Sequence, residues 1–206
     1  MHTYEAPRYF LKLITGPTAE PVAASDIKRQ VNLPSSFTGD DTWIADAITG
    51  VRQMFERRIP GGRAFINQTW DLTLDKFPKG DDAIEFPYPP LVSITSIAYY
   101  DASGSTASLA SSDYQTRLPT EQPGWIKPAV NKNWPSTQNR EDAVTIRYVA
   151  GYGSAASNVP MPVRHAIKMQ VAHLYENREA YADKPLHEVP VAVDALLGAV
   201  SWGYYG

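Results

Sequence analysis

Histidines are the side chains in this sequence that could most readily ligate a metal ion or act as a general base. There are four of them, His2, His165, His173 and His187. A helical zinc pair needs two histidines four residues apart, and a complete site needs three or four ligands close together. His165 and His173 are eight residues apart in the chain, which places them roughly 80° apart around a helix. The spacing therefore predicts no metal site.

Adjacent carboxylates are the second feature that could carry chemistry. They occur at Asp40 and Asp41, at Asp81 and Asp82, and at Glu141 and Asp142. Glycoside hydrolysis needs two carboxyl groups that face one cleft. Neighbouring residues on a helix or strand point in different directions, so capping and turn formation are the simpler roles for these pairs. A carbohydrate-binding or hydrolytic β protein stays the alternative interpretation.

The glycine-containing loop from 150 to 154, Ala-Gly-Tyr-Gly-Ser, superficially imitates a phosphate-binding loop between a strand and a helix. No Lys-Ser or Lys-Thr pair follows the glycines, and Pro160 removes an amide donor that a phosphate would use. The sequence also lacks the Gly-x-Ser-x-Gly pattern of a nucleophile elbow. We therefore predict that the protein has no catalytic residues and no cofactor, and that it is not an enzyme.

Composition excludes several further classes. The 206 residues include 19 basic and 22 acidic side chains, giving a formal net charge of −3, and there is no cysteine. Disulfide scaffolds and thiolate metal sites are therefore excluded, and tight binding of nucleic-acid phosphates is not expected. The first 21 residues do not read as a signal peptide, and nothing approaches the roughly 20 apolar residues of a membrane span. We expect no membrane partner.

Helical periodicity appears on both sides of the middle of the chain. The clearest stripe, Ile44, Ile48, Val51 and Phe55, predicts a helix from Asp40 to Arg58 that ends at Pro60-Gly61-Gly62. Further helices are predicted at about 24–31, 163–180 and 190–200. The start of the first is ambiguous, because Ala23 lies where a capping hydroxyl would be expected.

A period of two replaces the helical pattern between about 65 and 150. It predicts five or six antiparallel strands, and Asp101-Ala-Ser-Gly104 is typical of a hairpin turn. The strands are expected at 68–75, 83–86, 93–100, 113–118 and 144–149, and one more at Phe10–Ile14.

These elements predict an α+β fold: a small helical bundle with an inserted antiparallel β unit. The residues 1–206 would form a single domain, with the helical core at about 24–59 and 159–202 and the β insertion at about 64–150. Ile48, Val51 and Phe55 are expected to pack against Ile167, Val171 and Leu174. The alternative, a separate β domain linked to two loose helices, would leave more apolar surface exposed.

Aromatic residues gather at the C-terminal end of the sequence, in the segment 201–206. Trp202, Tyr204 and Tyr205 are of the types that anchor protein interfaces, so we predict that they bind a partner. The other interpretation is that Trp202 folds back onto the helical core. Aromatic residues near both ends, without a catalytic cluster, favour a subunit of an assembly.

Several runs, read in order, resemble the head–tail connector (adaptor) proteins of tailed bacteriophages and of phage-derived gene transfer agents. They include Gln68-Thr-Trp-Asp-Leu, Pro89-Pro-Leu-Val-Ser, Pro123-Gly-Trp-Ile-Lys and Tyr175-Glu-Asn-Arg178. The runs extend from about Phe10 to Val200. The sequence departs from the family pattern at Ala23, in the lengthened approach Ser154–Ser157, and in the aromatic tail.

The resemblance implies a structural role without a reaction. Twelve copies would form a ring beneath the portal protein, extend its DNA channel, and offer a docking surface to a tail-side stopper or completion protein. Double-stranded DNA would pass through without tight binding, which suits the net charge of −3. The implied location is the head–tail junction of a virion, assembled in the bacterial host cytoplasm.

Overall fold

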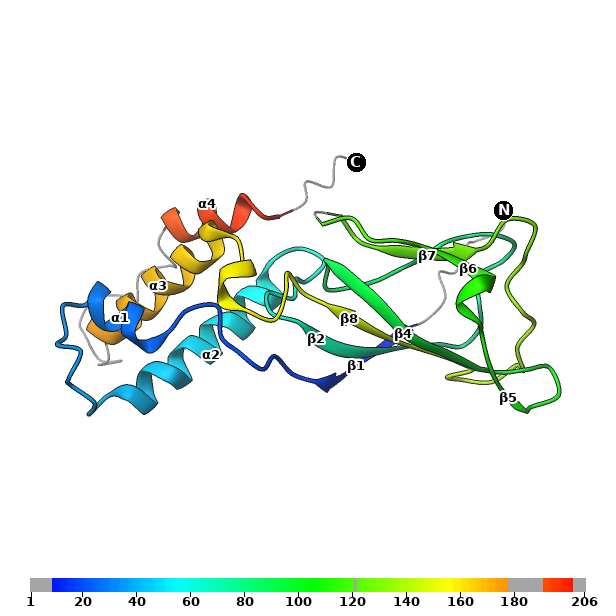
Figure 1. Cartoon of the computed structure of the whole chain (residues 1–206), viewed down its shortest axis with the longest axis horizontal. Coiled ribbons are helices and arrows are strands. Elements are labelled where there is room, and N and C mark those ends of the chain that lie inside the picture. The colour runs from blue at the N-terminus through cyan, green and yellow to red at the C-terminus, as the bar shows by residue number, and fades with distance from the viewer. Residues whose placement is uncertain (1–8, 121, 178–190, 202–206) are drawn as a thin grey trace. The chain divides into compact units, whose positions relative to one another are not determined.

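The computed structural model describes residues 9–120, 122–177 and 191–201. The chain divides into two compact units, one from residues 1–16 and 67–151 and the other from 17–66 and 152–206. Strands form the first unit and helices the second (Figure 1). The fold class is therefore α+β, as the sequence predicts. Each unit combines two segments that are far apart in the sequence.

The β unit contains two antiparallel sheets. The five-stranded sheet has the order β1-β2-β8-β4-β5, and the three-stranded sheet has the order β3-β7-β6. The strand bounds are β1 Tyr9–Thr15, β2 Gln68–Leu74, β3 Ile84–Glu85, β4 Leu91–Tyr100, β5 Thr106–Ser108, β6 Tyr114–Arg117, β7 Trp125–Pro128 and β8 Val144–Ala150. The predicted strand at 10–14 is thus β1, which pairs with β2.

Alternation along the strands sorts side chains onto two faces of the larger sheet. Leu72, Ile146 and Ile97 lie side by side across β2, β8 and β4, and all three are buried. Tyr148, two residues along β8, is also buried, packs against Phe86 and donates a hydrogen bond to the Pro87 carbonyl. Burial raises the pKa of the Tyr148 hydroxyl. This buried face supplies much of the core of the β unit.

The described residues contain two strands, β5 and β7, that the periodicity did not predict. The expectation of five or six strands was therefore too low. Residues Thr106–Ser108 form a short strand with no large apolar side chain, and Trp125–Pro128 ends in a proline. Both patterns are too short or too irregular for a period of two to stand out. The predicted turn is confirmed, because the Asp101 carboxylate accepts hydrogen bonds from the backbone N–H groups of Ser103 and Ser105 between β4 and β5.

The described part of the second unit contains four α-helices: α1 Ala24–Gln30, α2 Asp41–Arg58, α3 Met161–Glu176 and α4 Val191–Gly198. Short 3-10 turns lie at η1 Ser111–Asp113, in the β unit, and at η2 Ala156–Asn158. In Figure 1, α2 and α3 run beside each other, with α1 and α4 alongside α3. The predicted packing of α2 against α3 is confirmed. Ile48, Val51, Phe55, Ile167 and Val171 are buried, and Leu174 is partly buried against the same core.

The N-terminal ends of α1 and α2 are capped in unexpected ways. Ala23 is the N-cap of α1, and its backbone N–H donates to the Asp26 carboxylate at 3.2 Å. Only one of the two hydrogen bonds of a capping box is therefore present, the one accepted by the Asp26 carboxylate. The other is missing because the alanine side chain has no oxygen to accept it. Asp40 is the N-cap of α2, but its carboxylate accepts a hydrogen bond at 2.6 Å from the Tyr175 hydroxyl on α3. This residue joins the two long helices.

Candidate partner-binding surfaces

A buried charge network stabilises the helical unit. Arg52 on α2 donates hydrogen bonds of 2.8 Å to Glu20 and to Glu56, and the second Glu56 oxygen accepts from the Phe65 backbone N–H at 3.0 Å. Arg52 and Glu56 are buried. A buried ion pair is tolerated when its remaining polar atoms are also satisfied, and here the network joins segments on both sides of α2. It thereby ties Glu20 and the Phe65 backbone to α2.

Arg63 binds the backbone just after the C-terminal end of α4. This arginine is fully buried, and its guanidinium donates to the Val200 carbonyl at 2.7 Å and to the Tyr152 hydroxyl at 3.3 Å. Ser201 donates to the Gly198 carbonyl at 2.9 Å, which closes the end of α4. No sequence pattern predicted a functional role for Arg63. The available signal was its place between the Gly61-Gly62 turn and the apolar run Ala64–Ile66.

The predicted partner-binding residues Trp202, Tyr204 and Tyr205 lie outside the described residues. The structure does establish where the segment that carries them begins. Val200 is partly buried against the helical core, and its carbonyl is held by the buried Arg63. The aromatic residues therefore follow directly after an anchored backbone position.

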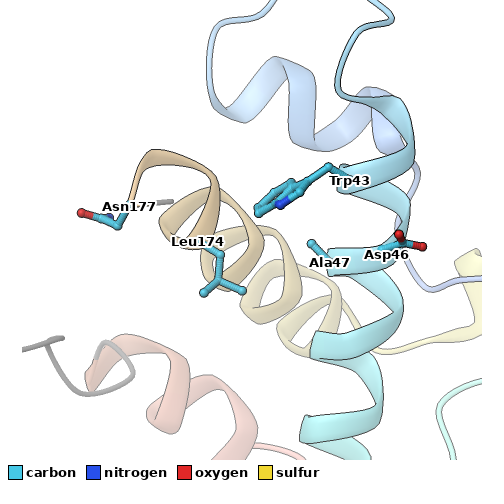
Figure 2. Close-up of a pocket in the computed structure, with 5 residues that line it drawn as sticks. All are labelled: Trp43, Asp46, Ala47, Leu174 and Asn177. Carbon is cyan, nitrogen blue, oxygen red and sulfur yellow. The ribbon is translucent and has the colours of Figure 1, made fainter. Parts of the chain in front are cut away.

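An open pocket lies between α2 and α3 (Figure 2). It is lined by Trp43, Asp46 and Ala47 from α2 and by Leu174 and Asn177 from the end of α3, and its volume is about 330 Å³. Figure 2 shows the Trp43 ring reaching from α2 toward α3. The same ring contacts Tyr175 edge to face, with centroids 5.6 Å apart.

The lining of this pocket is mostly apolar. Trp43, Ala47 and Leu174 are apolar, and the polar groups are one carboxylate and one amide. These five side chains provide no nucleophile with a neighbouring base.

Strand β1 gives the β unit an apolar edge. It is the outermost strand of the five-stranded sheet, and four of its seven residues are large, apolar and exposed: Tyr9 by 57%, Phe10 by 62%, Leu13 by 46% and Ile14 by 38%. Exposed edge strands of this length and character are normally shielded, because they add readily to other strands. Tyr9 and Phe10 are the two aromatic residues of this strand.

The face of the sheet opposite to its buried residues is charged. Arg147 on β8 makes two hydrogen bonds of 2.8 Å to the Asp71 carboxylate on β2, and these bonds raise the pKa of its guanidinium. Lys12 on β1 is opposite Asp71 in the strand register. Both signs of charge therefore occur on neighbouring strands, so this row of residues is not a cationic surface for nucleic acid.

The histidines do not come together into a site within the described part of the chain. His165 is exposed on α3, and His173, one turn before the end of that helix, accepts a hydrogen bond from Asn177 through its backbone carbonyl. His2 and His187 lie outside the described residues. Among residues 9–120, 122–177 and 191–201, no three histidine or carboxylate side chains are grouped to hold a metal ion. In those same ranges no helix has both the length and the apolar character needed to cross a bilayer.

Comparison with known proteins gives a clear result for the fold. No protein-family model matches the sequence, and no curated protein matches it. Solved structures do match. A chain from the neck of an empty gene transfer agent (GTA) particle, computed with C6 symmetry, is 20% identical, with a TM-score of 0.74 over 93% of this chain and 95% of that one.

Two further matches come from the same kind of particle. A chain from the virion of a native GTA particle is 19% identical, with a TM-score of 0.74 over 93% of this chain and 95% of that one. A chain from the neck of a native GTA particle, computed with C12 symmetry, is 20% identical, with a TM-score of 0.64 over 91% of this chain and 94% of that one. The protein therefore has the fold of chains found in GTA particles.

Proposed function

We propose that this protein is a structural head–tail connector (adaptor) subunit of a phage-like particle. The observation that carries the proposal is the match to a GTA neck chain over 93% of this chain and 95% of that one. Both chains are covered almost from end to end, so the likeness extends to the helical unit, the β unit and their order along the chain. The ordered sequence runs that resemble connectors support the same role.

In this proposal twelve copies form a ring beneath the portal protein, at the head–tail junction of a virion assembled in the host cytoplasm. The ring extends the DNA channel and offers a docking surface to a tail-side stopper or completion protein. The matched necks were computed with C6 and C12 symmetry, which supports a cyclic arrangement. A net charge of −3 allows DNA to slide through without many phosphate contacts.

The aromatic tail is proposed as an attachment segment. Trp202, Tyr204 and Tyr205 would dock onto a neighbouring subunit or onto the portal, starting from the Val200 carbonyl that Arg63 holds. Because the backbone before residues 201–206 is held in place, this segment samples a smaller volume before it docks. Less entropy is therefore lost on docking. No catalytic role is proposed for any residue.

Native mass spectrometry of the full chain, alone and with its portal protein, tests the proposal. We expect closed rings whose mass is an integer multiple of the subunit, with twelve copies when the portal is present. Deletion of residues 201–206 should weaken attachment to the ring or portal while the far-ultraviolet circular dichroism of the isolated subunit is retained. A chain that stays monomeric with the portal and instead binds glycans would favour the carbohydrate-binding alternative.

A further inference from the structure

Both faces of β1 carry large apolar side chains that solvent reaches. Side chains alternate along the regularly paired part of a strand, so Tyr9 and Leu13 share one face and Phe10 lies on the other. Ile14 follows at the point where the register with β2 shifts. All four are between 38% and 62% exposed. One long side of β1 pairs with β2, and no described strand pairs with its other side. Within the described ranges this edge of the β1 backbone is therefore unpaired, with apolar groups above and below it.

The opposite edge of the same sheet is built differently. There the last strand is β5, which has three residues, Thr106–Ser108, and no large apolar side chain. Short polar edge strands of this kind resist addition of further strands. The apolar character of β1 is thus particular to one edge, and an edge of seven residues is long enough to pair with another chain.

We propose that β1 is an interface for a second copy of this chain, which contacts the edge and both faces of β1 with a surface other than its own β1. The inference rests on the proposed ring, because neighbours in a closed ring meet through two different surfaces. An occupant that covers both faces of a strand must wrap around it, as a protein segment does. The matching chains come from particle necks computed with cyclic symmetry, in which the neighbour of a chain is another copy of it. A second copy of this chain is therefore the occupant that we propose.

Charge argues against DNA as the occupant of this surface. Lys12 is the only charged residue of β1, and Asp71 lies opposite it on β2. Phosphate binding requires several lysine or arginine side chains, so DNA would gain little at this edge. Burying the four apolar side chains requires a partner with apolar groups of its own, and exposed Leu118 and Val130 of the β unit are such groups.

A photo-cross-linking amino acid at position 10 tests the proposal directly. Phe10 would be replaced by p-benzoylphenylalanine, which keeps an aromatic ring, in the full chain and in assembled particles. Irradiation is expected to give a ladder of covalent oligomers, with cross-linked peptides from residues of a second copy outside 9–15. The matched control places the same amino acid at Phe37, which is 41% exposed in the helical unit. It should give no ladder.

Three results would overturn the proposal: cross-links confined to the same chain, cross-links from β1 to β1 in a dimer, or cross-links only to a different protein. A second measurement uses Phe10→Ser, with Phe37→Ser as its control. The first change should weaken self-association about tenfold or more by sedimentation, whereas the control should leave it unchanged, and both should keep the circular dichroism of the native chain.

The two proposals fail in different ways. If rings form and withstand Phe10→Ser together with Ile14→Ser, the ring stands and β1 is not its interface. If copies cross-link through β1 but an epitope-tagged chain is absent from particle necks, the interface stands and the connector function is wrong.

Discussion

Truncating Phe55 and Leu174 to alanine, one at a time, distinguishes complete from partial burial at the contact between α2 and α3. Phe55 is 0% exposed in the core of the helical unit, so Phe55→Ala removes a whole buried ring and leaves a cavity. Such changes cost about 3–5 kcal/mol of unfolding free energy. Leu174 is only partly buried and lines the open pocket, so Leu174→Ala should cost about 2 kcal/mol or less.

Urea unfolding followed by circular dichroism at 222 nm measures this difference in the helical unit. The signal suits the question because the four described α-helices all belong to that unit. We expect a lower transition midpoint with an unchanged slope for both variants, and the larger shift for Phe55→Ala. Met161→Ala, at a side chain that is 60% exposed, is the control and should shift the midpoint little. The reasoning would be refuted by equal costs for Phe55 and Leu174, or by a cost below about 1 kcal/mol for Phe55.

Three further predictions follow from single positions. Gly50→Ala, in an exposed part of α2 with open space around the added carbon, should raise the unfolding free energy by about 0.5–1 kcal/mol. Gly124→Ala should lower the unfolding free energy, because its added carbon would lie 2.4 Å from a leucine side chain. The urea unfolding midpoints of the two variants check both expected changes. Arg58→Ala breaks an exposed 2.8 Å ion pair with Asp194 and should cost less than about 1 kcal/mol in thermal unfolding, so a larger loss would contradict the exposed geometry. Hydrogen bonds from Ser103 lower the pKa of the Asp101 carboxyl below the usual 3.8. The contribution of Asp101 to stability is therefore present above pH 3.8 and is lost as the pH falls through the pKa of the folded state. An NMR titration midpoint for Asp101 at or above 3.8 would contradict this prediction.

Local patterns in the sequence were enough to predict the helices and most of the strands. The stripe from Ile44 to Phe55 has helical spacing, and the structure has the eighteen-residue α2 at Asp41–Arg58. The alternation in 68–75 likewise predicted β2, which the structure has at Gln68–Leu74. These predictions succeed because the side-chain period is set by backbone geometry within a few residues. Very short strands such as β5 carry too few residues to show a period.

The candidate surfaces depended on contacts between distant segments, which only the tertiary structure supplies. Trp43 and Leu174 could each be predicted on an apolar helix face, but their shared pocket requires the first turns of α2 to lie beside the last turns of α3. Arg63 appeared as an ordinary basic residue until the fold placed its guanidinium on the Val200 carbonyl.

The clearest contrast between sequence and tertiary structure is in β1. The apolar run Phe10–Ile14 predicted a strand, and an apolar run in a strand would ordinarily indicate burial. The order β1-β2-β8-β4-β5 instead places it at the edge of the sheet, where Phe10 and Leu13 are exposed. Strand order depends on pairing between residues some sixty positions apart, such as Leu11 with Leu72, and a local period contains no information about that partner. The sequence by itself therefore determined that these residues form a strand, whereas the long-range pairing decided that the strand is an exposed edge.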